Sequence, residues 1–201
     1  MNDTILSSIT PDNAAVFAEA LTAADIAPLV ERLASQEDKI RYPAFLLLRA
    51  RSAIANDLSP YWDLLAEKLT SANSYQRSIG AMLLAANARW GDTERIRAVL
   101  PAYFALLNDE KPITVRQSVQ ALPQVLSAHP LLADDISKAL MRIDLMQVKE
   151  TMRKLILADV IEALLAAREI SPNASIEEYL FSALNGGILD EKTKKQLQKR
   201  I

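Results

Sequence analysis

Four segments of this chain repeat one residue pattern at intervals of about one helix pair, and this periodicity constrains the fold more than any other feature. Each segment begins with a basic residue, at Arg41, Arg77, Arg116 and Lys149. The steps between these positions are 36, 39 and 33 residues. A leucine stands six positions after each basic residue, at Leu47, Leu83, Leu122 and Leu155. Repeats of this length are typical of arrays in which each unit buries its apolar face against the next.

A second amphipathic stretch precedes each segment, so we expect every unit to be a first helix, a short turn and a second helix. These stretches are residues 25–33, 61–69, 96–107 and 136–140. In the first of them, Ile26, Leu29, Val30 and Leu33 return at helical spacing. Helix ends along the chain carry the expected signals. Thr22 and Asp25 resemble a capping box, Ser175 and Glu178 predict another, and Gly91 predicts a left-handed helix end.

The composition agrees with an all-helical chain. Half of the 201 residues are hydrophobic and 24% are charged, whereas only 4 Gly and 9 Pro are present. A β-sandwich or barrel needs a turn signal every ~8–12 residues, which this chain does not supply. There is no cysteine, so disulfides, thiolate catalysis and cysteine-based metal sites are excluded. We expect a cytoplasmic protein, since residues 1–10 show no signal-peptide pattern and no apolar run reaches membrane-spanning length.

The pattern resembles the HEAT-repeat (armadillo-like) α-solenoid family. Its first helices read Ala27-Pro28-Leu29-Val30 and Leu100-Pro101-Ala102, with an early proline, and a second helix opens with Val115-Arg116. The resemblance covers roughly residues 22–168, and the second unit departs from it by lacking the proline. It implies an all-α fold, a right-handed α-α superhelix of about four helix pairs. In one domain over 1–201, residues 11–21 would form an N-terminal cap helix, 22–168 the repeats and 172–201 the C-terminal cap helices.

Two positions in the repeat have expected structural roles. Gly80 stands in the middle of a second helix, where it costs about 1 kcal/mol relative to alanine. We therefore predict a close approach between Gly80 and the preceding first helix. The resemblance implies that the basic column from Arg41 to Lys149 binds turn acids and carbonyls rather than a phosphate chain.

The primary hypothesis for function is a non-enzymatic binding module, or scaffold, that docks a protein or peptide on the concave face of its second helices. Stepping along the repeat from Tyr42 places a set of side chains on that face. The candidate partner-binding residues are Tyr42, Phe45, Arg49, Ser78, Met82, Gln117, Gln120, Gln124, Arg153 and Lys154.

Two alternatives remain open. One is nucleic-acid binding, or a DNA glycosylase like the DNA-alkylation-repeat enzymes, which use concave aromatic residues and an aspartate. The candidates for that role are Trp62, Trp90 and Asp159, although the tryptophans do not share one column. The other is a homo-oligomer held by opposite charges at its ends. Residues 1–40 carry seven acids and two bases, net −5, and residues 186–201 carry five bases and two acids, net +3.

The sequence shows no catalytic, cofactor-binding or metal-binding constellation. His129 is the only histidine, and without cysteine one histidine makes no zinc site of the usual kind. No Gly-rich phosphate loop or nucleophile turn is present. HEAT-like bilin lyases stay open because their signal is diffuse. The basic helix expected over residues 190–201, with Leu197 and Ile201 on its apolar side, is interpreted as a solvated cap rather than a membrane-surface helix.

Overall fold

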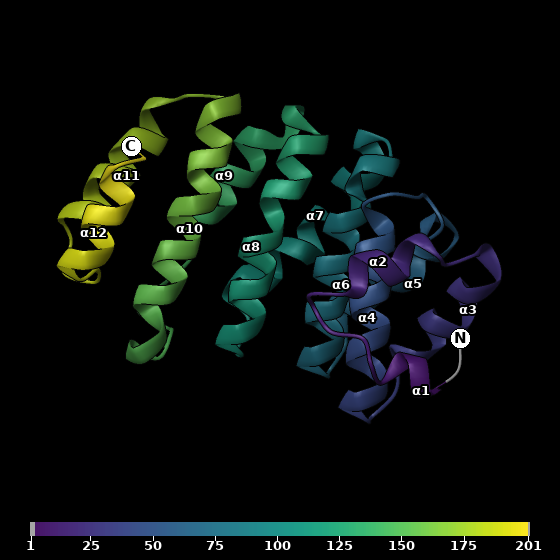
Figure 1. The fold of residues 1–201 in the computed structure, drawn as a ribbon. Helices are drawn as coiled ribbons and strands as arrows, with labels where there is room; N and C mark the ends of the chain where they lie inside the picture. Colours follow the sequence, from purple (N-terminus) through teal and green to yellow (C-terminus); the bar gives the residue numbers. More distant parts are fainter. Residues whose placement is uncertain (1–2, 201) are drawn as a thin grey trace. The chain divides into compact units, whose positions relative to one another are not determined.

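The computed structural model describes residues 3–200, with side chains described from residue 5 onward. Within these residues every regular element is a helix and no strand is present, so the all-α prediction is confirmed. The backbone contacts divide the chain into two compact units, Met1–Gly91 and Asp92–Ile201. The prediction of one domain over 1–201 stays a prediction, and the two units are described separately (Figure 1).

The first unit contains an N-terminal cap and two helix pairs. Its elements are α1 (Asp3–Leu6), α2 (Ala14–Glu19), α3 (Ala23–Arg32), α4 (Asp38–Ser52), η1 (Ser59–Tyr61), α5 (Trp62–Glu67), η2 (Lys68–Thr70), α6 (Ser74–Asn87) and η3 (Ala88–Trp90). Helix α4 packs on α3, and α6 packs on α5 and η2. The two second helices, α4 and α6, also contact each other, which closes the apolar face of each pair.

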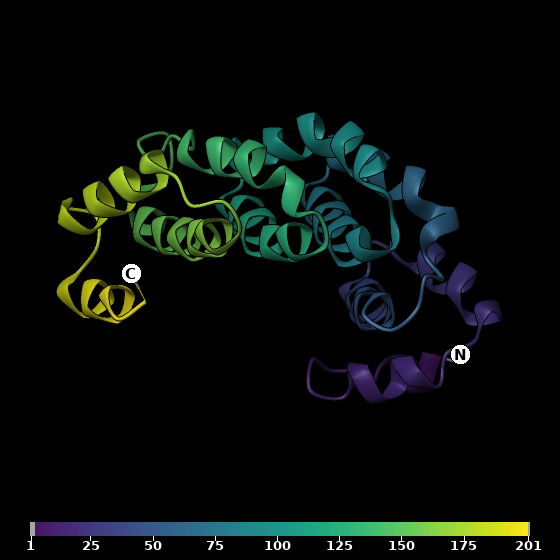
Figure 2. The same ribbon diagram turned by 90° about the horizontal axis from the view of Figure 1, so that it is seen from above.

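The second unit contains two longer pairs and a C-terminal cap. Its elements are α7 (Thr93–Ala105), η4 (Leu106–Asn108), α8 (Pro112–Ala128), η5 (Pro130–Leu132), α9 (Ala133–Met141), α10 (Glu150–Ile170), α11 (Ala174–Asn185) and α12 (Glu191–Gln198). The second helices α8 and α10 share the most extensive contact in this unit. Figure 2 shows α7 and α9 in one layer and α8 and α10 in the other.

Side-chain caps fix where several helices begin. The backbone N–H of Thr22 donates to a carboxylate oxygen of Asp25 at 3.0 Å, so the predicted capping box is present. The capping box predicted at Ser175 is wrong, because Asn173 caps α11 by accepting from the N–H of Ile176 at 3.0 Å. Gly91 follows η3 with φ −97° and ψ 163°, an extended conformation, so the predicted left-handed helix end is also wrong.

Three of the four predicted leucine positions lie in the core. Leu47, Leu83 and Leu122 are fully buried, but Leu155 is 38% exposed and its neighbour Ile156 is buried instead. The fourth position is wrong because Lys149 precedes α10 as its N-cap residue, whereas Arg41 and Arg77 are the fourth residues of their helices. The repeat is therefore out of phase at α10.

The predicted close approach at Gly80 is confirmed. A Cβ atom added there would lie 2.9 Å from the carbonyl oxygen of Leu65 and 2.9 Å from the Cβ of Lys68, both on the preceding first helix. Cβ atoms in proteins essentially never lie this near to a backbone atom. Glycine thus lets α6 approach α5 and η2 more closely than alanine would allow.

We expect Gly80→Ala to lower the free energy of unfolding by about 1–2 kcal/mol. Alanine gains about 1 kcal/mol in helix propensity, but the overlap with Leu65 costs about 2–3 kcal/mol because the carbonyl cannot move away. Urea denaturation followed by circular dichroism measures the change. Gly187→Ala is the matched control, since nothing lies within 4 Å of a Cβ there. A stabilised Gly80→Ala protein would show that the helices do not meet at this residue.

Candidate functional site

The face of the second helices in the first unit is more covered than the repeat predicts. Tyr42 and Arg49 on α4 are exposed and Met82 on α6 is half-buried, in keeping with the predicted surface. Phe45 and Ser78 are each only 5% exposed, so their predicted exposure is wrong. Phe45 is buried because α2 packs against α4, and Ser78 because α6 lies between α4 and the α5–η2 segment.

Two exposed tyrosine rings mark the surface that remains. Tyr42, in the second turn of α4, is 48% exposed, and Tyr75, in the first turn of α6, is 60% exposed. The guanidinium carbon of Arg41 lies 4.8 Å from the centre of the Tyr75 ring, a cation–π contact between the two helices. The ring of Tyr42 stacks on that of Phe45 at 6.3 Å. We call Arg41, Tyr42 and Tyr75 the aromatic patch.

Arg41 is the rigidly held member of this patch. Its side chain is buried, and it donates to the carbonyl oxygen of Ser35 at 2.8 Å and to the carboxylate of Asp38 at 2.5 Å. Arg77 likewise donates to the carbonyl oxygens of Ser71 and Ala72. The expectation that the basic column binds turn carbonyls is therefore confirmed at these two positions. The patch presents rings that lose little conformational freedom when they bind another molecule.

In the second unit, the basic positions are used differently. Arg116 on α8 forms a bidentate pair with Asp159 on α10, at 2.6 and 3.2 Å, and the amide of Gln120 donates to Asp159 at 2.8 Å. The carboxylate raises the pKa of Arg116 through these hydrogen bonds. Asp159 therefore ties two second helices together, and Arg153 replaces Lys149 as the residue that bonds the turn carbonyls, those of Met146 and Val148.

Most predicted binding residues of this unit already have partners within the chain. Lys154 on α10 pairs with Asp190 at 2.6 Å, and Gln120 and Arg153 bond as described above. Gln117 is half-buried and Gln124 is exposed, and in the described part of the chain no hydrogen bond joins their side chains to other groups. The face of the second helices thus offers fewer free polar groups here than the sequence suggested.

The C-terminal helix α12 is docked on its own chain. Leu197 is buried, and the pair Lys154–Asp190 with a second ion pair, Arg200–Glu162, joins the two ends of this segment to α10. The hydrogen bond from Lys154 lowers the pKa of Asp190. This docking agrees with the cap interpretation, since Leu197 is not available to a membrane surface. Ile201, also assigned to this helix, lies outside the described residues.

The residues considered for catalysis do not converge. Trp62 is buried, which contradicts its predicted exposure, and the indole N–H of Trp90 donates to the carbonyl oxygen of Ser52 at 2.7 Å. His129 is buried, with Nδ1 3.1 Å from the hydroxyl oxygen of Thr93. Burial lowers the pKa of Lys68 and raises that of Tyr103, but the two lie on different elements in different units. Among residues 5–200, no group of three or more metal-ligating side chains occurs.

Sequence comparison adds no family to this account, since neither the known family models nor the curated proteins give a match. Across the described helices, none combines the length and apolar character that crossing a bilayer demands. Tyr75 was missed by the sequence reasoning. Its position in the first turn of a second helix, beside the basic column, is the signal that would have found it.

We predict that Arg116 and Asp159 are coupled by about 1–2 kcal/mol in the free energy of unfolding, because the pair is bidentate and its side chains are only 24% and 13% exposed. A double-mutant cycle with Arg116→Ala and Asp159→Ala measures this. The control cycle is Arg97 with Asp135, a pair that is 45% and 48% exposed and should couple by about 0.5 kcal/mol or less. Equal coupling energies in the two cycles would contradict the claim that Asp159 holds α8 and α10 together.

Proposed function

We propose that this chain is a non-enzymatic HEAT-like α-solenoid module that binds a protein or peptide segment on the face of its second helices. The proposal includes the arrangement of the four helix pairs as a right-handed superhelix. It is supported by the alternation of first and second helices in both units and by the arginines that close the turns in α4 and α6. Solenoids of stacked helix pairs present extended surfaces that suit chain-like ligands.

The aromatic patch is the observation that carries the binding role. Tyrosine and arginine are enriched at the centres of protein interfaces, because they bury large areas and still offer hydrogen bonds. Tyr42 and Tyr75 are 48% and 60% exposed, so both rings are open to a partner. The buried Arg41 fixes the ring of Tyr75, so the patch is organised before a partner arrives.

The structure disfavours both forms of the first alternative, a nucleic-acid binder and a DNA glycosylase. A nucleic-acid site requires several cations free to reach phosphates, yet Arg41, Arg77, Arg116 and Arg153 are bonded within the chain. An enzyme requires titratable groups that converge in one cleft, and the described groups with shifted pKa values are scattered. We therefore place peptide or protein binding first. Self-association through the charged ends stays open as an alternative, because Lys192 and Lys195 on α12 and Lys199 just after it are exposed.

Selection of a random peptide library on the intact chain tests the proposal. We expect at least one enriched peptide family whose affinity, measured by fluorescence anisotropy, falls about tenfold or more in the double variant Tyr42→Ala with Tyr75→Ala. Both side chains are exposed, so the variant should unfold at nearly the same urea concentration as the wild type.

Phe181→Ala is the control, since Phe181 is an exposed aromatic residue on α11, in the other unit. It should leave the affinity of that peptide family unchanged. The proposal fails if no enriched peptide loses affinity in the tyrosine double variant. Binding of a DNA duplex that weakens steeply with salt would instead favour the nucleic-acid alternative.

A further inference from the structure

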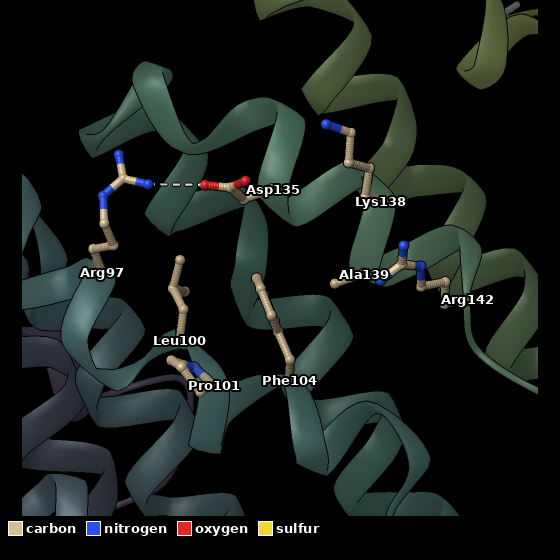
Figure 3. A pocket seen from close by; sticks show the side chains of 8 residues that line it. All are labelled: Arg97, Leu100, Pro101, Phe104, Asp135, Lys138, Ala139 and Arg142. Carbon is tan, nitrogen blue, oxygen red and sulfur yellow. Dashed lines mark hydrogen bonds and ion pairs between the residues drawn. The ribbon is translucent and has the colours of Figure 1, made fainter.

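A groove lies between α7 and α9 in the second unit, on the layer of first helices (Figure 3). Its volume is about 310 Å³. Each helix contributes four residues at the spacing i, i+3, i+4 and i+7, which is one face of an α-helix. The lining residues are Arg97, Leu100, Pro101 and Phe104 from α7, and Asp135, Lys138, Ala139 and Arg142 from α9 and its C-terminal end. Two helical stripes therefore face each other across the groove.

Apolar side chains line the α7 wall of the groove. Figure 3 shows Leu100 and Phe104 side by side on α7, one turn apart. Leu100 is buried, Phe104 is half-buried and Pro101 is exposed. Proline has no N–H group, so this stretch of wall offers carbon atoms and no backbone donor at Pro101. Covering such a wall with an apolar group lowers the free energy of the complex, whereas its carbon atoms offer no ligand to a bare ion.

Some charged side chains of the groove have an ion-pair partner and others have none. At one end Arg97 pairs with Asp135 at 2.9 Å, as the dashed line in Figure 3 shows. At the other end Lys138 and Arg142 stand four residues apart on one helix face, where two like charges repel each other. Neither has a hydrogen bond or ion pair within residues 5–200. With three cations against one carboxylate, the lining carries a net charge of +2.

We propose that this groove binds an acidic peptide segment that carries an apolar side chain next to a carboxylate. The carboxylate lies between Lys138 and Arg142, where it relieves their repulsion and pairs with the planar guanidinium. The adjacent apolar side chain covers Phe104 and Pro101, because Leu100 is already buried. Only two cations are free, and Asp135 adds a negative charge, so a nucleic-acid backbone finds no stripe of phosphate contacts here. The site lies on other helices than the aromatic patch and does not depend on it.

The experiment uses the intact, isotope-labelled chain and three short probes in a nuclear magnetic resonance titration. The first probe is acetyl-phenylalanyl-glutamate amide. The second replaces glutamate by glutamine, which keeps the shape and removes the charge, and the third replaces phenylalanine by alanine. We expect the first probe to shift the amide signals of residues 97–100, 102–104 and 135–142, with a dissociation constant in the millimolar range. The other two should bind about fivefold or more weakly, since each lacks one of the two contacts.

Variants assign the charge contact. The double variant Lys138→Gln with Arg142→Gln alters two exposed side chains, and its spectrum reports directly whether it is folded. It should lose the preference for glutamate over glutamine, whereas Lys192→Gln, which removes an exposed lysine from α12, should keep that preference. The proposal is overturned if the glutamate probe gives no localised shifts at a concentration about ten times the expected dissociation constant. It is likewise overturned if the glutamine probe binds equally well. It is also overturned if a DNA duplex perturbs these signals at lower concentration than the peptide.

Discussion

Burial of one apolar stripe along each second helix is the interaction on which the rest of this structure depends. Leu47, Leu83 and Leu122 are fully buried on α4, α6 and α8, and α10 buries Ile156. Each such side chain contributes about 1.5–3 kcal/mol when it leaves water. A single helix pair does not enclose its own stripe. The neighbouring pair within the unit supplies the missing cover, through α4 against α6 and through α8 against α10.

Close packing of this kind decides where the polar groups go. The turns between first and second helices leave carbonyl oxygens without helical partners, and arginine side chains reach back to bond them in α4, α6 and α10. These cations are then committed to the fold. The groups that remain for other molecules include the rings of the aromatic patch, and Lys138 with Arg142 beside the α7–α9 groove.

The sequence predicted the elements of the fold well because the periodicity of a helix pair depends on residues that are close together in the sequence. The pairing, the Thr22 capping box and the role of Gly80 all follow from neighbours within one unit of the repeat. Leu155 was misassigned because the basic residue used for alignment, Lys149, stands before its helix instead of inside it. Only the position of the helix start reveals that difference.

The candidate site was less predictable, because exposure depends on elements outside the repeat. Phe45 fits the exposed column by spacing, but α2 covers α4. Gln120 and Arg153 have the composition of binding residues, yet they bond to Asp159 and to turn carbonyls. The α7–α9 groove escaped notice for a related reason. Its two faces are polar–apolar stripes on separate helices, and only their apposition makes a site.

The most direct test of this account compares two adjacent residues of α10. Ile156 is fully buried and Leu155 is 38% exposed, although both are aliphatic and of equal size. Urea denaturation of Ile156→Ala should show a loss of about 2–5 kcal/mol in the free energy of unfolding, because it leaves a cavity between α10 and its neighbours. Leu155→Ala should lose less than about 1 kcal/mol. The reverse order would place the other face of α10 in the core and contradict the packing on which the two units rest.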